Sequence, residues 1–251
     1  MNMPGAHHED SLLAYLPPLR RARGWRLYAE DGRRFLDLYC DRGRGILGAK
    51  AGGQAKLAKA MIDRGMVSGY PSLWEARLRK ALKTWIPDFA EARFYSGESR
   101  LGDLGLPVRE AFDDFLQPQR SSLAWARLPV PAAWSFGILL CETSTEAESL
   151  PPEDRIPPLC LAMAVRAISD LKDFSAWYAE GHWSSFDPFV SRLFTRKGPW
   201  LIPSYGEEAH KDVFLAALSM GLLLSPDFRR PSLVPGEFDR GEAAPLGRIL
   251  A

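Results

Sequence analysis

The sequence contains few of the residue types that form most metal and disulfide sites. Only three cysteines and four histidines occur in 251 residues. Cys40, Cys141 and Cys160 are odd in number and far apart, which favours reduced thiols in a cytoplasm over a disulfide framework. No spacing of histidine, cysteine and aspartate resembles a zinc site. We therefore predict neither a disulfide scaffold nor a metal centre.

An excess of one charge and long apolar runs are missing as well. Lys+Arg number 32 and Asp+Glu number 31, a net charge of +1, so the basic excess typical of nucleic-acid binding is not seen. No run reaches the roughly 18 apolar residues that a membrane span needs. The polar opening MNMPGAHHED is unlike a signal or transit peptide. We expect a cytoplasmic protein whose partners are neither nucleic acids nor membranes.

The sequence does contain the composition of a globular protein with mixed elements, 46% hydrophobic and 25% charged. Its clearest local signal is a hairpin, in which Trp25–Glu30 and Arg33–Leu38 flank Asp31-Gly32. This pair predicts a two-residue turn with positive φ at both positions. Helical spacing predicts helices over 54–64, 72–85, 107–120, 159–178 and 207–220, the second opened by a capping box of Ser72 and Glu75 and the last ended at Gly221.

The remaining segments indicate short strands and loops. Strands are predicted over 92–95, 123–130, 135–141 and 222–225, and the short connection within 123–141 favours antiparallel neighbours. Residues 143–158 are acidic and proline-rich, which predicts a loop, and residues 181–206 are aromatic and irregular. The aromatic side chains there suit core packing or a partner surface. This order of elements predicts an α/β or α+β fold.

Several segments resemble class III aminotransferases, the pyridoxal-phosphate enzymes of the glutamate-1-semialdehyde and acetylornithine type. The hairpin over 24–38, with its Asp-Gly turn and Leu-Asp pair, is followed by a glycine-rich stretch, as in that family. Further similar segments are the helix over 74–85 with its Ile86-Pro87 stop, Arg93-Phe-Tyr-Ser-Gly97, and residues 214–226. In this sequence the glycine-rich stretch is Gly43-Arg-Gly45-Ile-Leu-Gly48.

The resemblance implies a reduced aminotransferase-like fold, in which a small-domain hairpin and a C-terminal α/β piece surround a remnant mixed sheet. We expect a polar lead over 1–24, a single compact domain over 25–235 and a tail over 236–251. Within the domain, residues 25–90 and 205–235 would supply small-domain elements and 91–204 the remnant of the cofactor domain.

The resemblance also implies a cofactor site with three parts: a lysine for the aldimine, an acid beside the pyridine nitrogen, and backbone N–H groups for the phosphate. The phosphate loop would lie at Ser96, Gly97 and Ser99, but Glu98 stands where the family has a small hydroxyl residue and would repel a phosphate. Glu142, after the strand over 135–141, is the candidate acid, although a solvated glutamate that opens an acidic loop is the competing interpretation.

The lysine has no candidate. Five lysines precede the phosphate loop, and the other three lie within a predicted helix, in the aromatic segment and in a first helical turn: Lys50, Lys56, Lys59, Lys80 and Lys83, then Lys172, Lys197 and Lys211. None follows a strand-end acid and precedes the glycine-rich turn that the family uses. Members of the family are also considerably longer, so the resemblance implies that much of the catalytic centre is missing here.

Three functions remain open. The first is a shortened, non-catalytic aminotransferase-like protein with a binding or subunit-interaction role, as a homodimer or with a partner subunit. The second is an active pyridoxal-phosphate aminotransferase or aminomutase with an unusual or partner-supplied site. The third is an unrelated α+β binding protein.

Overall fold

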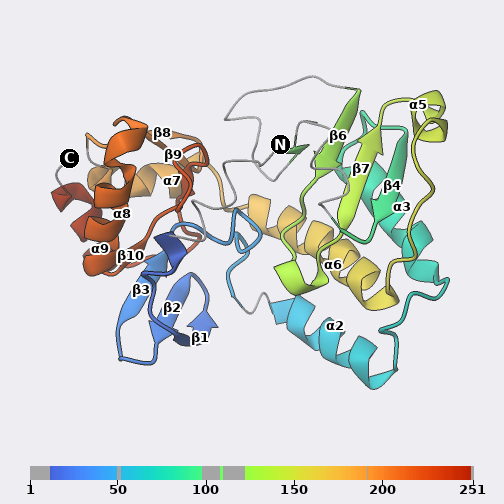
Figure 1. Ribbon diagram of the computed structural model, residues 1–251, viewed down its shortest axis with the longest axis horizontal. Coiled ribbons are helices and arrows are strands. Elements are labelled where there is room, and N and C mark those ends of the chain that lie inside the picture. Colours follow the sequence, from blue (N-terminus) through green and yellow to red (C-terminus); the bar gives the residue numbers. More distant parts are fainter. Residues whose placement is uncertain (1–11, 50–51, 98–107, 110–121, 191, 250–251) are drawn as a thin grey trace. The chain divides into compact units, whose positions relative to one another are not determined.

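The computed structural model describes residues 12–49, 52–97, 108–109, 122–190 and 192–249. It forms two compact units (Figure 1). Unit 1 contains residues 12–49 and 175–249, and unit 2 contains the described residues from 52 to 174. The chain therefore leaves unit 1, builds unit 2 in one continuous stretch, and returns to unit 1. The sequence predicted one domain over 25–235. A single domain made of these two units stays a prediction.

Unit 2 is built on a four-stranded sheet in the order β4 (Glu91–Tyr95), β7 (Gly137–Cys141), β6 (Leu123–Ala126) and β5 (Val108–Arg109). Strand β7 runs antiparallel to both β4 and β6, and β5 runs parallel to β6. The predicted antiparallel relation of the two central strands is confirmed. The helix predicted over 107–120 is wrong at residues 108–109, which form β5, and the rest of that segment lies outside the described residues.

Three helices supply the core on one face of this sheet: α2 (Gly52–Asp63), α3 (Leu73–Trp85) and α6 (Pro158–Ser175). Alternate strand residues such as Phe94, Ile138 and Leu140 meet Leu78 and Leu82 of α3 in this core. The opposite face carries a smaller cluster of Tyr95, Trp125, Leu139 and Leu150. All three helices follow from the apolar spacing in the sequence.

Unit 1 brings the two ends of the described chain together. Its first sheet has the order β1 (Leu19–Arg23), β2 (Arg26–Ala29), β3 (Arg34–Asp37) and β10 (Leu222–Leu223), with β10 parallel to β3. Its second sheet has the order β11 (Ser232–Leu233), β9 (Trp200–Pro203) and β8 (Phe194–Lys197). The hairpin therefore pairs with a C-terminal strand, and both belong to segments that the resemblance assigned to small-domain elements.

The helices of unit 1 are short. They are α7 (Glu180–Trp183), α8 (His210–Ser219) and α9 (Arg240–Ala243), with 3₁₀ turns at Ser184–Phe189, Glu207–Ala209 and Ala244–Arg248; unit 2 adds α5 (Ser144–Glu148) and a 3₁₀ turn at Ala132–Trp134. Segments predicted as lead, loop and tail thus contain β1, α5 and α9, and the aromatic segment contains the β8–β9 hairpin. These elements are too short to give a clear periodic signal.

Two local predictions were right in place but wrong in detail. The hairpin forms, yet its loop has three residues, because Ala29 N–H donates to Arg33 O and only Gly32 has a positive φ. A type I turn followed by a left-handed glycine fits this geometry. The capping box at Ser72 does not form; Glu75 contacts Arg79 instead. A capping box that the sequence analysis missed joins Thr143 and Glu146 at the start of α5.

Within the described part of the chain, no helix combines the length and apolar character that crossing a bilayer requires. All three cysteines are described, and none of them forms a disulfide.

Candidate functional site

The predicted phosphate loop begins where β4 ends. Ser96 donates both its backbone N–H and its hydroxyl to the same carboxylate oxygen, Asp154 Oδ2, over 2.9 Å and 2.7 Å. The Asp154 N–H in turn donates to Phe94 O over 2.9 Å. Ser96 itself lies in a bend, Gly97 follows it without regular secondary structure, and Ser99 lies outside the described residues. The two donors of Ser96 that a phosphate would use are therefore already bound to an anion of the protein itself.

The candidate acid Glu142 lies far from this loop. Strands β4 and β7 are antiparallel, with Tyr95 opposite Gly137 and Glu91 opposite Cys141. Ser96 therefore follows one end of the strand pair and Glu142 follows the other, about 13 Å or more away along strands that rise about 3.3 Å per residue. The Glu142 side chain is exposed, and its N–H donates to Ser122 O over 2.9 Å. The structure does not bring the two parts of the predicted site together.

Polar side chains cover part of the outer edge of β4. Glu153 Oε1 accepts the Phe94 N–H over 2.9 Å, and both Glu153 oxygens lie 2.8 Å from Arg79 Nη2. Arg79 Nη1 also donates to Ala92 O. These bonds satisfy backbone groups that an open edge strand would offer to another chain. The segment of Glu153 and Asp154 therefore covers the sheet edge at Phe94 and also binds Ser96.

The described lysines do not provide an aldimine-forming residue in a buried place. All seven are exposed: Lys56, Lys59, Lys80, Lys83, Lys172, Lys197 and Lys211. Lysines that form Schiff bases are usually activated by desolvation or by a neighbouring cation. Lys50 lies outside the described residues. The described lysines thus have the environment of ordinary solvated side chains.

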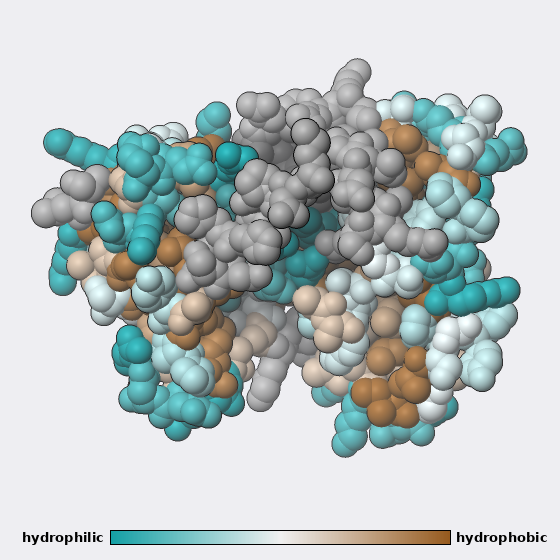
Figure 2. Space-filling view, viewed as in Figure 1, coloured by the Kyte–Doolittle hydropathy of each residue, from teal (hydrophilic) through white to brown (hydrophobic). Residues whose placement is uncertain are grey.

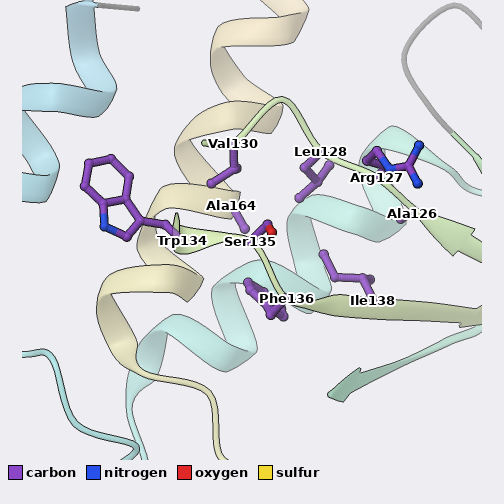
Figure 3. A pocket seen from close by; sticks show the side chains of 9 residues that line it. All are labelled: Ala126, Arg127, Leu128, Val130, Trp134, Ser135, Phe136, Ile138 and Ala164. Atoms are coloured by element: carbon purple, nitrogen blue, oxygen red, sulfur yellow. The ribbon is translucent and has the colours of Figure 1, made fainter. Parts of the chain in front are cut away.

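A small cavity lies between β6, β7 and α6 (Figure 3), lined by Ala126, Arg127, Leu128, Val130, Trp134, Ser135, Phe136, Ile138 and Ala164. The side chains of Arg127 and Trp134 extend toward opposite sides of the view. The cavity volume is about 10 Å³, which is about the space that one water molecule needs. A pyridine ring does not fit in this cavity.

A second unusual place follows β3 in unit 1. Cys40, Asp41 and Arg42 have φ values of 50°, 46° and 59°, and Gly43 continues at 86°. Consecutive left-handed residues are rare, because each non-glycine residue there costs roughly 1–2 kcal/mol. Strained backbone of this kind is concentrated at functional sites. The glycines of this stretch stand out in the sequence, but the left-handed turn before them gives no signal there.

The carboxylate of Asp37 holds the start of this turn. Its Oδ1 accepts the N–H groups of Cys40 and Tyr39 over 2.8 Å and 3.0 Å. Burial raises the pKa of Asp37 to about 6, although these two hydrogen bonds act in the opposite direction. Arg230 donates to Arg42 O at the other side of the turn. Burial and the charge of Asp41 raise the pKa of Tyr39 to about 12.

Taken together, the described residues do not fit pyridoxal phosphate. The loop expected to hold the phosphate is bound to Asp154, the candidate acid is at the other end of the strand pair, and the described lysines are exposed. Sequence reasoning missed Asp154 because it lies 58 residues from Ser96. The only sequence signal that bears on this loop was Glu98, an acid at an unsuitable position.

Comparison with other proteins gives the fold but no named family. No protein-family model matches the chain. Two uncharacterised relatives are similar in sequence: one from Borreliella burgdorferi, 25% identical over 92% of this chain and 89% of its own, and one from Treponema pallidum, 26% identical over 86% and 88%.

Solved structures of aminotransferases are similar along nearly the whole chain. N-acetylornithine aminotransferase from Stenotrophomonas maltophilia has a TM-score of 0.62 at 14% identity, over 95% of this chain and 96% of that chain. Ornithine delta-aminotransferase from Plasmodium falciparum has a TM-score of 0.66 at 10% identity, over 95% of both chains. A transaminase with pyridoxal phosphate bound has a TM-score of 0.68 at 10% identity, over 97% and 95%.

These alignments extend well beyond the segments that carried the resemblance in sequence. At such low identity, the likeness concerns the fold. It also argues against the third possibility, an unrelated α+β fold. The chain therefore has an aminotransferase-like fold of mixed α and β structure.

Proposed function

We propose that this protein is a non-catalytic relative of the class III aminotransferases that acts in the cytoplasm by binding or by subunit interaction. The observation that carries the proposal is the double hydrogen bond from Ser96 to the Asp154 carboxylate. A fixed negative charge at this place competes for the phosphate donors and repels a phosphate. The separation of Ser96 from Glu142 supports the same conclusion.

The direct experiment is to add pyridoxal phosphate to the purified protein and to reduce the mixture with borohydride. We expect no aldimine absorbance and no lysine trapped at a single position. A stoichiometric adduct on one lysine would instead support the second candidate, an active enzyme with an unusual lysine. That candidate has one specific observation in its favour, the likeness of the fold to a transaminase with pyridoxal phosphate bound.

Subunit interaction is supported by apolar side chains that unit 2 exposes between the end of α2 and the start of α3. Ile62, Val67, Tyr70 and Leu73 are 51%, 49%, 73% and 76% exposed. Figure 2 shows apolar surface in the region of α2. Several exposed apolar side chains in one short segment of sequence favour an interaction surface. We infer a homodimer or a partner subunit here, and light scattering of the wild type and of Leu73→Asp tests the homodimer: the variant should be monomeric where the wild type is dimeric.

A further inference from the structure

A groove in unit 2 lies beside the first half of β4, away from Ser96. Its volume is about 290 Å³, at the lower end of the range of about 300–1,000 Å³ that ligand pockets occupy. The lining residues come from the C-terminal half of α3, from β4 and from β7: Arg79, Lys80, Leu82, Lys83, Ile86, Phe89, Ala90, Glu91, Ala92 and Leu140.

The lining of this groove combines apolar and cationic residues. Leu82, Phe89, Ala92 and Leu140 line the groove and belong to the buried core of unit 2, so the floor of the groove is apolar. Lys80 and Lys83 are exposed, and neither forms an ion pair with a residue in the described part of the chain. An apolar floor beside two solvated ammonium groups suits a molecule with an apolar body and a negative end.

Two other charged residues, Arg79 and Glu91, line the groove. Arg79 is bound to Glu153, Glu75 and Ala92 O, so its charge is compensated. Glu91 also lines the groove and is exposed, and its negative charge opposes an anion. Two ammonium groups against one carboxylate leave a positive excess.

The edge strand adds a backbone donor. The Ala92 C=O points away from β7, since it accepts from Arg79 across the outer edge of β4. The N–H and C=O of one strand residue point to the same side, so the Ala92 N–H also faces outward, beside the groove. A carboxylate is an acceptor for such an N–H group as well as for ammonium groups.

We propose that this groove binds a small aliphatic monocarboxylate, with its chain against Leu82 and Phe89 and its carboxylate at Lys80 and Lys83. This binding role does not depend on the presence or absence of catalysis, because the groove contains none of the residues assigned to the cofactor.

Calorimetric titration with octanoate tests the proposal on the full chain, with octylammonium as the probe of opposite charge. We expect saturable binding of octanoate with one site, and binding of octylammonium at least about tenfold weaker. Lys80→Ala/Lys83→Ala should weaken octanoate binding about tenfold, which corresponds to about 1.4 kcal/mol. The matched control is Lys56→Ala/Lys59→Ala, two exposed lysines at the same spacing on α2, and it should change the affinity less than about twofold.

Two further variants distinguish the contribution of the ligand's aliphatic chain from that of the charges around the groove. Ala90→Trp adds bulk at an exposed residue that lines the groove and should weaken octanoate binding about tenfold with both lysines intact. Glu91→Gln removes the opposing charge and should tighten it about twofold. Circular dichroism checks that each variant is folded. The proposal is overturned if octanoate does not saturate, if octylammonium binds equally well, or if the two double variants behave alike.

Discussion

Asp154 accepts two hydrogen bonds from Ser96, one from the backbone N–H at 2.9 Å and one from the hydroxyl at 2.7 Å. The same residue donates its own N–H to Phe94 O. The end of β4 is thus closed by a carboxylate from a distant segment, where an aminotransferase-like loop would bind a phosphate. This relationship makes a testable contribution to stability.

Asp154→Ala should lower the free energy of unfolding by about 1–2 kcal/mol, because both donors of Ser96 lose their acceptor. Asp154→Asn keeps one acceptor oxygen and should cost about 1 kcal/mol or less. Urea unfolding followed by tryptophan fluorescence gives both values. Asp88→Ala, at an exposed position of the same unit, is the control and should be neutral. Equal stability of all three variants would contradict the structural role of Asp154.

Glu153→Ala should destabilise unit 2 more strongly, by about 2–3 kcal/mol, because it leaves the Phe94 N–H without its acceptor and removes the closer of the two carboxylates that contact the half-buried Arg79. Arg79 then keeps only its weaker contact with Glu75 and its hydrogen bond to Ala92 O. The matched control is Glu75→Ala, which removes the other carboxylate that contacts Arg79, at 3.3 Å and on an exposed surface. We expect that control to change stability by less than about 0.5 kcal/mol. Thermal or urea unfolding distinguishes the two variants, and similar losses of stability would argue against this role of Glu153 at the sheet edge.

Gly236→Ala should destabilise unit 1 by about 1–3 kcal/mol through overpacking. A Cβ at this position would lie 2.3 Å from Cζ2 of Trp25, and that indole is fixed by a hydrogen bond to Ile46 O of 3.1 Å. Gly241→Ala in α9 meets no heavy atom within 4 Å and should be neutral or stabilising by up to about 1 kcal/mol, since alanine favours the helix. The changes in the free energy of unfolding, measured in urea, should therefore have opposite signs or clearly different sizes in the two variants.

The pKa of Asp37 predicts a pH dependence of stability. In the folded protein this pKa is about 6, above the ordinary value of 3.8, so the folded state binds the proton more tightly than the unfolded state. The contribution of Asp37 to stability is therefore fully present below about pH 4 and is lost as the pH rises through about 6. A shift of this size corresponds to about 3 kcal/mol.

Asp37→Asn isolates this effect, because the amide oxygen still accepts the N–H groups of Tyr39 and Cys40 while the charge is removed. The variant should be more stable than the wild type at about pH 7.5 and should lose that advantage at about pH 4. Other titrating groups, such as His210, contribute equally to both proteins and cancel in the difference. A difference in unfolding free energy that does not vary with pH would contradict the raised pKa.

Local elements of the fold could be predicted from the sequence, because their causes lie within a few residues. The Asp31-Gly32 pair predicted the hairpin, and the spacing of Leu78 and Leu82 predicted the buried face of α3. The same reasoning failed at the start of α3, because Ser72 and Arg79 compete for the side chain of Glu75. Glu75 contacts Arg79, so the capping box with Ser72 does not form. The short elements β1, α5 and α9 gave no periodic signal.

The candidate site could be predicted only in part, because its decisive contacts join distant residues. Ser96 and Gly97 were located from a motif, but the partner of Ser96 lies in a segment that the sequence suggested was a solvated acidic loop. The separation of Ser96 from Glu142 depends on the antiparallel direction of β4 and β7, and the motif contains no information about strand direction. The left-handed turn after Asp37 could not be predicted either, since three of its four residues are not glycine.

The central claim is that this aminotransferase-like protein does not form an aldimine with pyridoxal phosphate. The measurement is a titration of the intact chain with pyridoxal phosphate, followed by borohydride reduction and peptide mass analysis of all eight lysines. We predict no saturable aldimine absorbance and only scattered, substoichiometric labelling. Saturation with one adduct per chain on a single lysine would contradict this account.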